Sequence, residues 1–208
     1  MLAVKASPAL DAAQGDAGLH CLHWLDIHAA EANMSNVLVI VYSYTGTSRR
    51  VAELLCSQQN WPLASITEVQ PRAGGLGSLR CVIDSLLRRR PAIRYDGPPP
   101  TDFDAVVLVS PIWLLQLASP MRAFVARQRG RLPDVAVLSV MGGQGAPNAA
   151  AEIARILDRA PILSSSVTMR EVDDGSCAAR LQAFGTAVRD AEASHDVVRP
   201  VTLSPQSS

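Results

Sequence analysis

One short segment of the chain concentrates side chains that can bind a phosphate. It consists of Ser43, Tyr44, Thr45, Gly46, Thr47 and Ser48. A continuous apolar and β-branched run precedes it, and an apolar helical pattern follows it. Unpaired N–H groups at a helix start attract an anion, and hydroxyl groups complete its hydrogen bonds. An ordinary helix cap needs one Ser or Thr, whereas this segment has four, so it predicts a phosphate site.

Several phosphate-handling and hydrolytic chemistries are excluded by missing residues. An ATPase or GTPase loop needs a lysine before its Ser or Thr, and the only lysine is Lys5. A dinucleotide fingerprint needs three glycines, whereas Gly46 stands alone. Ser110 stands where a phosphate-accepting aspartate would follow the third strand, and no cysteine has an arginine six residues on. A Ser-His-Asp hydrolase would depend on His195, near the end of the chain.

The elements that must position the 43–48 segment alternate between strand and helix from residue 36. The hydrophobic patterns predict strands over 37–43, 63–69, 105–110, 135–141 and 162–169. They predict helices over 48–59, 77–90, 148–159 and 176–193, and one that opens at Ser119 and Pro120. This alternation predicts an α/β fold, a doubly wound five-stranded parallel sheet with helices on both faces. Ligands of such sheets bind beyond the carboxyl ends of the strands.

The 43–48 segment resembles the FMN-phosphate loop of the flavodoxin family, whose usual form is Ser/Thr-x-Thr-Gly-Asn-Thr. Thr47 replaces the Asn and Ser48 replaces the last Thr, and both keep a hydrogen-bonding side chain. The similarity runs from about residue 36 to 193 and includes Ser110-Pro111-Ile112-Trp113 and the helix start at Pro120. The last strand has no insertion, which resembles the short-chain type. The resemblance implies the strand order 2-1-3-4-5 and FMN as the cofactor.

The resemblance also assigns the residues around the flavin ring. It places the 111–117 loop on one side, with Trp113 as the stacking residue; the alternative is a Trp packed under the loop. The 142–145 loop faces the other side, where Gln144 is a candidate for the pyrimidine edge; the alternative is a flexible turn. The predicted cofactor-binding residues are Ser43, Tyr44, Thr45, Gly46, Thr47, Ser48, Pro111, Ile112, Trp113, Leu114, Gly142, Gly143, Gln144 and Gly145. No metal ligand and no acid–base residue is predicted.

The surroundings of the flavin favour an enzyme over a carrier. Electron carriers of this family place a Tyr in the loop after the fourth strand and are typically acidic. The 142–145 loop has no Tyr, and residues 35–208 carry 18 Arg against 15 Asp and Glu. We therefore expect an oxidoreductase that passes electrons from NAD(P)H through FMN to a quinone-like acceptor. The alternatives are an electron carrier between a reductase and a partner redox enzyme, or a cofactor-free binding protein on the same fold.

Composition sets the remaining expectations. The chain has 208 residues, 48% of them hydrophobic, and zero formal charge, which indicates a globular protein without a nucleic-acid partner. No apolar run is long enough to span a membrane, and four dispersed cysteines suit the cytoplasm. We expect a domain over 34–198, a disordered tail over 199–208, and a disordered extension or overcalled start over 1–33. The histidines at 20, 23 and 28 match no standard metal-ligand spacing.

Overall fold

The computed structural model describes residues 36–69 and 91–196, and five parallel strands form its centre. These are β1 (Val37–Tyr42), β2 (Leu63–Glu68), β4 (Ala105–Trp113), β6 (Asp134–Met141) and β7 (Leu163–Thr168). They lie in the order β2-β1-β4-β6-β7, which is the predicted order 2-1-3-4-5. Since β1 pairs with β2 on one side and β4 on the other, the order reverses at β1. The loops after β1 and β4 therefore flank the switch point where such sheets bind ligands.

Two further strands, which the patterns did not predict, extend this sheet. β3 (Ile93–Asp96) pairs antiparallel with the edge strand β2, and β5 (Gln116–Leu117) pairs antiparallel with the end of β4. Both are very short, so neither carries enough alternation to be distinguished from a loop. The sheet is consequently mixed, with its parallel centre as expected.

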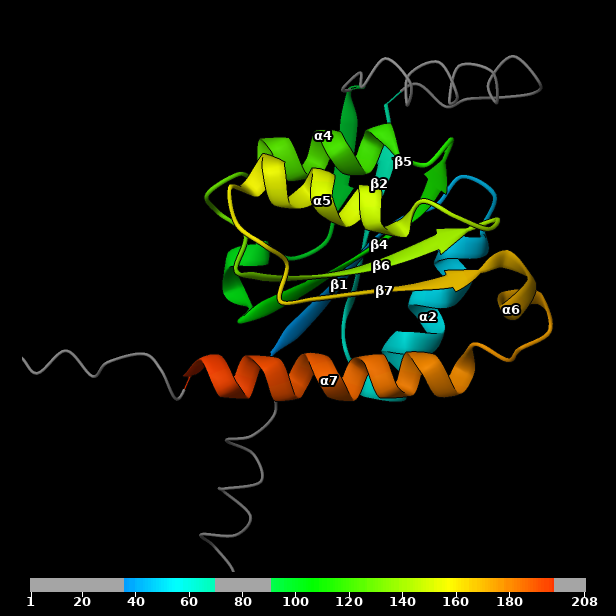
Figure 1. Cartoon of the computed structure of the whole chain (residues 1–208). Coiled ribbons are helices and arrows are strands. Elements are labelled where there is room, and N and C mark those ends of the chain that lie inside the picture. The colour runs from blue at the N-terminus through cyan, green and yellow to red at the C-terminus, as the bar shows by residue number, and fades with distance from the viewer. Residues whose placement is uncertain (1–35, 70–90, 197–208) are drawn as a thin grey trace, which may run out of the picture. The chain divides into compact units, whose positions relative to one another are not determined.

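Helices cover both faces of the sheet (Figure 1). α4 (Ser119–Arg127) and α5 (Ala146–Leu157) lie on one face, and α2 (Thr47–Gln59) and α7 (Ala178–Asp196) lie on the other. In β1, Leu38 and Ile40 belong to the core under α4 and α5, and the three valines of the strand belong to the core under α2 and α7. Every residue of β1 is therefore buried, which explains its unbroken apolar sequence.

Local sequence accounts for where several elements begin and end. α4 begins at Ser119, with Ala118 as its N-cap and Pro120 in the first turn, so Ser119 is not the cap that the Ser-Pro pair suggests. α5 begins at Ala146, two residues before the predicted start, because Gly145 adopts a left-handed conformation at its N-cap. β7 ends at Thr168, whose side chain caps the short helix α6 (Met169–Asp173) in a reciprocal capping box with Glu171.

Some expectations lie outside the described residues, namely the helix over 77–90, the 1–33 segment with its histidines, and the 199–208 tail. Within the described ranges, no helix is long and apolar enough to cross a membrane. No cluster of His, Cys, Asp or Glu in this part of the chain is arranged to hold a metal ion. A 3-10 turn, η1 (Pro100–Asp102), connects β3 to β4.

Candidate functional site

The loop after β1 folds back on itself before α2 begins. Gly46 is the N-cap of α2 and has a φ of 93°, a left-handed conformation that glycine adopts without steric cost. Its N–H donates to the Ser43 hydroxyl over 3.1 Å. The hydroxyl oxygens of Thr45 and Thr47 lie 3.4 Å apart. The loop thus holds its own shape and brings the hydroxyls of Thr45 and Thr47 together at the start of the helix.

The first turn of α2 is open to an acceptor. No side chain caps this helix, and no acidic residue lies in its first turn. The first helical N–H group with an acceptor is that of Arg50, which donates to the Gly46 carbonyl over 3.0 Å. Among the described residues, none accepts from the N–H groups of Thr47, Ser48 and Arg49. Three donors at the positive end of a helix dipole are an arrangement that attracts anions, so we call the start of α2 the candidate anion site.

The predicted 111–117 loop is a β-hairpin. β4 continues through Pro111 to Trp113, because Pro111 still pairs with Val140 of β6 in the parallel register. A two-residue turn, Leu114 and Leu115, then leads into β5. These leucines have φ angles of 47° and 63°, and their exposed fractions are 55% and 48%. A turn with positive φ at both positions normally takes Asn or Gly, so both leucines are strained.

Trp113 joins the hairpin to the first loop. Its ring meets the Tyr44 ring edge-on, with 5.9 Å between centroids, and meets Tyr42 in the same way at 6.0 Å. The Tyr42 hydroxyl in turn donates to a Glu68 carboxylate oxygen over 2.6 Å. Trp113 is half-buried against the core below α4. The structure therefore brings the predicted first and second loops together through aromatic contacts, and ring stacking by Trp113 stays a prediction.

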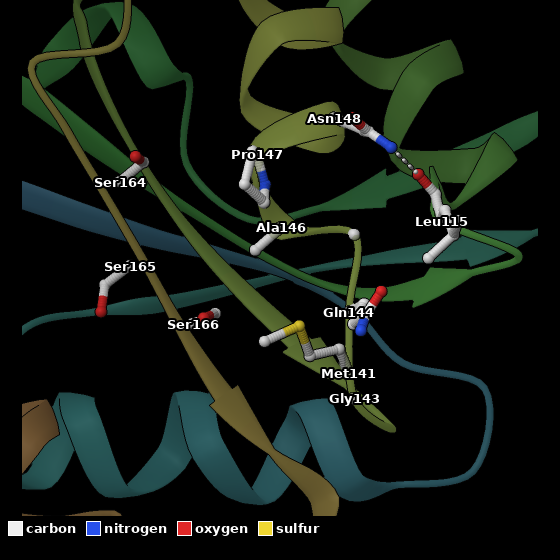
Figure 2. A pocket seen from close by; sticks show the side chains of 11 residues that line it. Leu115, Met141, Gly143, Gln144, Ala146, Pro147, Asn148, Ser164, Ser165 and Ser166 are labelled. Carbon is white, nitrogen blue, oxygen red and sulfur yellow. Dashed lines mark hydrogen bonds between the residues drawn. The ribbon is translucent and has the colours of Figure 1, made fainter.

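The loop after β6 touches the hairpin. A Cβ added at Gly145, where φ is 110°, would lie 2.7 Å from the Cα of Leu115, so only glycine allows this approach. Asn148 Nδ2 donates to the Leu115 carbonyl over 3.2 Å. Gly142, Gly143 and Gln144 are exposed. The second and third predicted loops are thus in direct contact, and Gln144 lies beside the hairpin turn (Figure 2).

A cleft of about 610 Å³ opens beside the loop after β6 (Figure 2). The lining residues that the structure describes are Leu115, Met141, Gly143, Gln144, Gly145, Ala146, Pro147, Asn148, Ser164, Ser165 and Ser166. We call it the β7 cleft. None of the 43–48 residues lines it, so it is separate from the candidate anion site. Leu115 lies in the predicted 111–117 loop, whereas Met141, Asn148 and the three serines lie outside the predicted loops. The Ser triplet in the edge strand β7 is a local signal that could have indicated them.

No family model and no curated protein matches the sequence of this chain. Solved structures do match its fold. A flavoprotein from Lactobacillus acidophilus in complex with FMN has a TM-score of 0.54 at 19% identity, with 68% of this chain and 99% of that chain covered.

Two candidate flavoproteins from Bacteroides are also similar. The protein from Bacteroides uniformis has a TM-score of 0.60 at 16% identity and covers 72% of this chain and 97% of its own. The one from Bacteroides eggerthii has a TM-score of 0.57 at 22% identity, with 68% and 95% covered. Together with the strand order, these likenesses establish a flavodoxin-like α/β fold.

Proposed function

We propose that the protein binds FMN, with the phosphate at the 43–48 loop, and acts as an oxidoreductase between NAD(P)H and a quinone-like acceptor. The open start of α2 carries this proposal. The N–H groups of Thr47, Ser48 and Arg49 have no acceptor among the described residues. The same loop carries the hydroxyls of Thr45 and Thr47, which lie 3.4 Å apart, and it lies beside the switch point of the sheet.

The donor set fits a phosphate monoester. The 43–48 loop offers hydroxyl and N–H donors and contains no carboxylate. Arg49 and Arg50 also lie in the first turn of α2, but each contacts a carboxylate: Arg49 Nη1 lies 3.6 Å from Glu53 Oε1, and Arg50 Nη2 lies 2.8 Å from Asp173 Oδ1. The donors left for the phosphate are therefore the N–H and hydroxyl groups of the loop. Thr45, Thr47 and Ser48 would hold the phosphate, and Trp113 would lie against the ring. Bound FMN supplies the capacity to accept a hydride and pass its electrons on.

The comparisons support the choice of cofactor. The Lactobacillus acidophilus flavoprotein, whose fold this chain shares, forms a complex with FMN. Sheets with this strand order bind their ligands at the switch point, which is where the 43–48 loop and the hairpin at Trp113 meet.

We favour an enzyme because the small residues of the loop after β6 leave open space beside the loop, where a second substrate could bind. Gly142 and Gly143 are exposed, and a Cβ added at either would meet no atom within 4 Å. No aromatic side chain from 142–145 can cover a ring there. A second substrate therefore has access. In the proposed reaction NAD(P)H gives up a hydride, the medium gives one proton, and the quinone gains both to become a hydroquinone, leaving NAD(P)⁺.

Binding of the cofactor is tested by titrating the purified full chain with FMN and with riboflavin, which lacks the phosphate. We expect FMN to bind at least tenfold more tightly, because riboflavin has no group for the α2 donors. Equal affinity for the two compounds would contradict the phosphate site, and binding of neither would contradict the cofactor.

The reaction is tested on the FMN-loaded protein. We expect steady NAD(P)H oxidation that depends on an added quinone such as duroquinone, measured by absorbance, and no turnover after the flavin is removed. If the FMN-loaded protein oxidises no NAD(P)H, the proposed enzymatic activity is wrong, and the alternative of an electron carrier is favoured.

A further inference from the structure

The β7 cleft has walls from four separate elements. The hairpin turn supplies Leu115, the end of β6 and its loop supply Met141 and Gln144, the first turn of α5 supplies Asn148, and β7 supplies its three serines. The cleft measures about 610 Å³, within the range of roughly 300–1,000 Å³ that holds small organic ligands. It shares residues 143–145 with the predicted cofactor-binding residues, and Leu115 belongs to the 111–117 loop that the resemblance places on one side of the flavin ring.

Leu115, which forms one wall of the cleft, has a strained backbone conformation that its neighbours hold in place. Leu115 has a φ of 63° yet is tied to α5 by the Asn148 side chain and packed against Gly145. Below it, Arg122 Nη2 donates to the Leu117 carbonyl of β5 over 2.9 Å. Strained backbone persists where surrounding structure fixes it, and such positions cluster at ligand sites. The cleft is therefore preformed.

The cleft is electrically neutral, and the helix start beside it is a poor anion site. None of its eleven described lining residues carries a charge. Pro147 has no N–H, and the N–H groups of Asn148 and Ala149 both donate to the Gly145 carbonyl, over 3.1 and 3.2 Å. In the first turn of α5, only the N–H of Ala146 is left for a ligand. The start of α2 offers three such groups, so a phosphate is drawn there instead.

The polar groups that remain suit carbonyl oxygens. Side chains alternate along a strand, and Val167 belongs to the core under α7, so Ser164 and Ser166 face the α5 side. Their hydroxyls and the Gln144 carboxamide are neutral donors. Leu115 and Met141 supply apolar surface. This combination favours a flat, uncharged ring that bears carbonyl groups.

We propose that the β7 cleft binds the electron acceptor, and that the acceptor is a neutral carbonyl-bearing ring compound of the quinone class. The assignment of the ligand as acceptor rests on the proposed function, because residues 143–145 line the cleft and also belong to the predicted cofactor site. Binding itself depends only on the cleft and is testable with or without flavin.

The test compares duroquinone with chloranilate by equilibrium dialysis against the full chain. Both are fully substituted benzoquinones of similar size, and neither has an open ring position for cysteine addition, but chloranilate is an anion at neutral pH. We expect duroquinone to bind at least tenfold more tightly. Equal binding, or preference for chloranilate, overturns the proposal.

A matched pair of variants locates the binding. Ser164 is exposed and lies outside the predicted cofactor residues. Ser164→Asn keeps a donor and should retain duroquinone affinity within about twofold, whereas Ser164→Asp offers only acceptors and should lower it about fivefold or more. Equal affinities in the two variants overturn the location. If the Asp variant fails to fold, the ligand pair alone decides.

FMN titrations of the same samples separate this inference from the proposed function. Duroquinone binding without FMN binding would contradict the proposed FMN cofactor and support the proposal that the β7 cleft binds a quinone. FMN binding without duroquinone binding would refute the cleft alone. If FMN competes with duroquinone, the cleft is part of the cofactor site, and the inference fails.

Discussion

Arg122 and Glu152 form a buried ion pair, with Arg122 Nε 2.6 Å from Glu152 Oε1. Their side chains are only 2% and 5% exposed. The pair joins α4 to α5. The Arg122 guanidinium also donates to the carbonyl of Leu117 in β5, which ties the hairpin to α4. Arg122 Nη1 is buried with no hydrogen-bond partner among the described residues. The two helices that flank the hairpin are thus fixed by charge as well as by packing.

Removing one partner of this pair should be costly. Glu152→Ala leaves the Arg122 charge buried and unpaired, which we expect to lower the free energy of unfolding by about 3–5 kcal/mol. Arg155→Ala is the matched control, since Arg155 contacts the same carboxylate over 3.8 Å but is 64% exposed, and should cost less than about 1 kcal/mol. Urea denaturation measures both. Similar losses of unfolding free energy in the two variants would show that burial of the ion pair does not determine its contribution to stability.

The hairpin turn should become more stable when its leucines are replaced. Leu114→Asn with Leu115→Gly relieves two left-handed leucines, and we expect a gain of about 1–2 kcal/mol in the free energy of unfolding. The control is Asn60→Gly. Asn60 (φ 58°) already suits a left-handed conformation, so this variant should change the free energy of unfolding by only about a few tenths of a kcal/mol. A destabilised double variant would mean that the leucines contribute more by contact than they cost by strain.

Thr47 should contribute to phosphate affinity. Thr47→Val preserves shape and removes the hydroxyl, so we expect FMN binding to weaken by about 1.5 kcal/mol, roughly tenfold. Riboflavin binding should not change, since it has no phosphate. Thr186→Val on α7, whose hydroxyl bonds the Gln182 carbonyl, is the control for a generic loss of hydroxyl. An equal loss of FMN and riboflavin affinity would place Thr47 elsewhere than at the phosphate.

Trp113 should quench the fluorescence of bound flavin. Stacked aromatic rings lie in contact, so bound FMN should be dim in the unaltered protein and brighter in Trp113→Phe. Trp61→Phe is the control, because Trp61 packs in the other core beside Arg189. Flavin that stays equally dim in both variants would favour Trp113 as a packing residue against Tyr42 and Tyr44.

Cys56 should be unreactive. Burial, with a smaller contribution from the Glu53 carboxylate, raises the pKa of the Cys56 thiol to about 12. A raised pKa keeps the thiol protonated at pH 8, and only the thiolate is nucleophilic. Burial also raises the pKa of Cys177. In a variant with Cys21 and Cys81 changed to Ser, we expect slow labelling by a disulfide reagent until the protein is unfolded by urea. Rapid labelling of the folded variant at pH 8 would contradict the raised pKa values.

Local sequence patterns were sufficient to predict the parallel centre of the fold. The 37–43 run contains only residues that suit a strand covered on both faces, and β1 is buried throughout. The four hydroxyl residues after it and the glycine within them predicted the open helix start, because loop chemistry next to a strand is a local property. These features are encoded in adjacent residues, so no tertiary information was needed.

The hairpin, the ion pair and the β7 cleft could not be predicted from local patterns, because each arises where distant segments pack together. β5 forms because β4 extends past Pro111 and offers an edge, and Leu114 and Leu115 have no propensity for the turn they adopt. Arg122 and Glu152 are thirty residues apart and acquire their roles only when α4 and α5 pack together. Likewise, Leu115, Gly145 and the β7 serines line one cleft because separate elements meet there. Contacts between distant segments depend on the packing of the whole sheet, which local patterns do not contain.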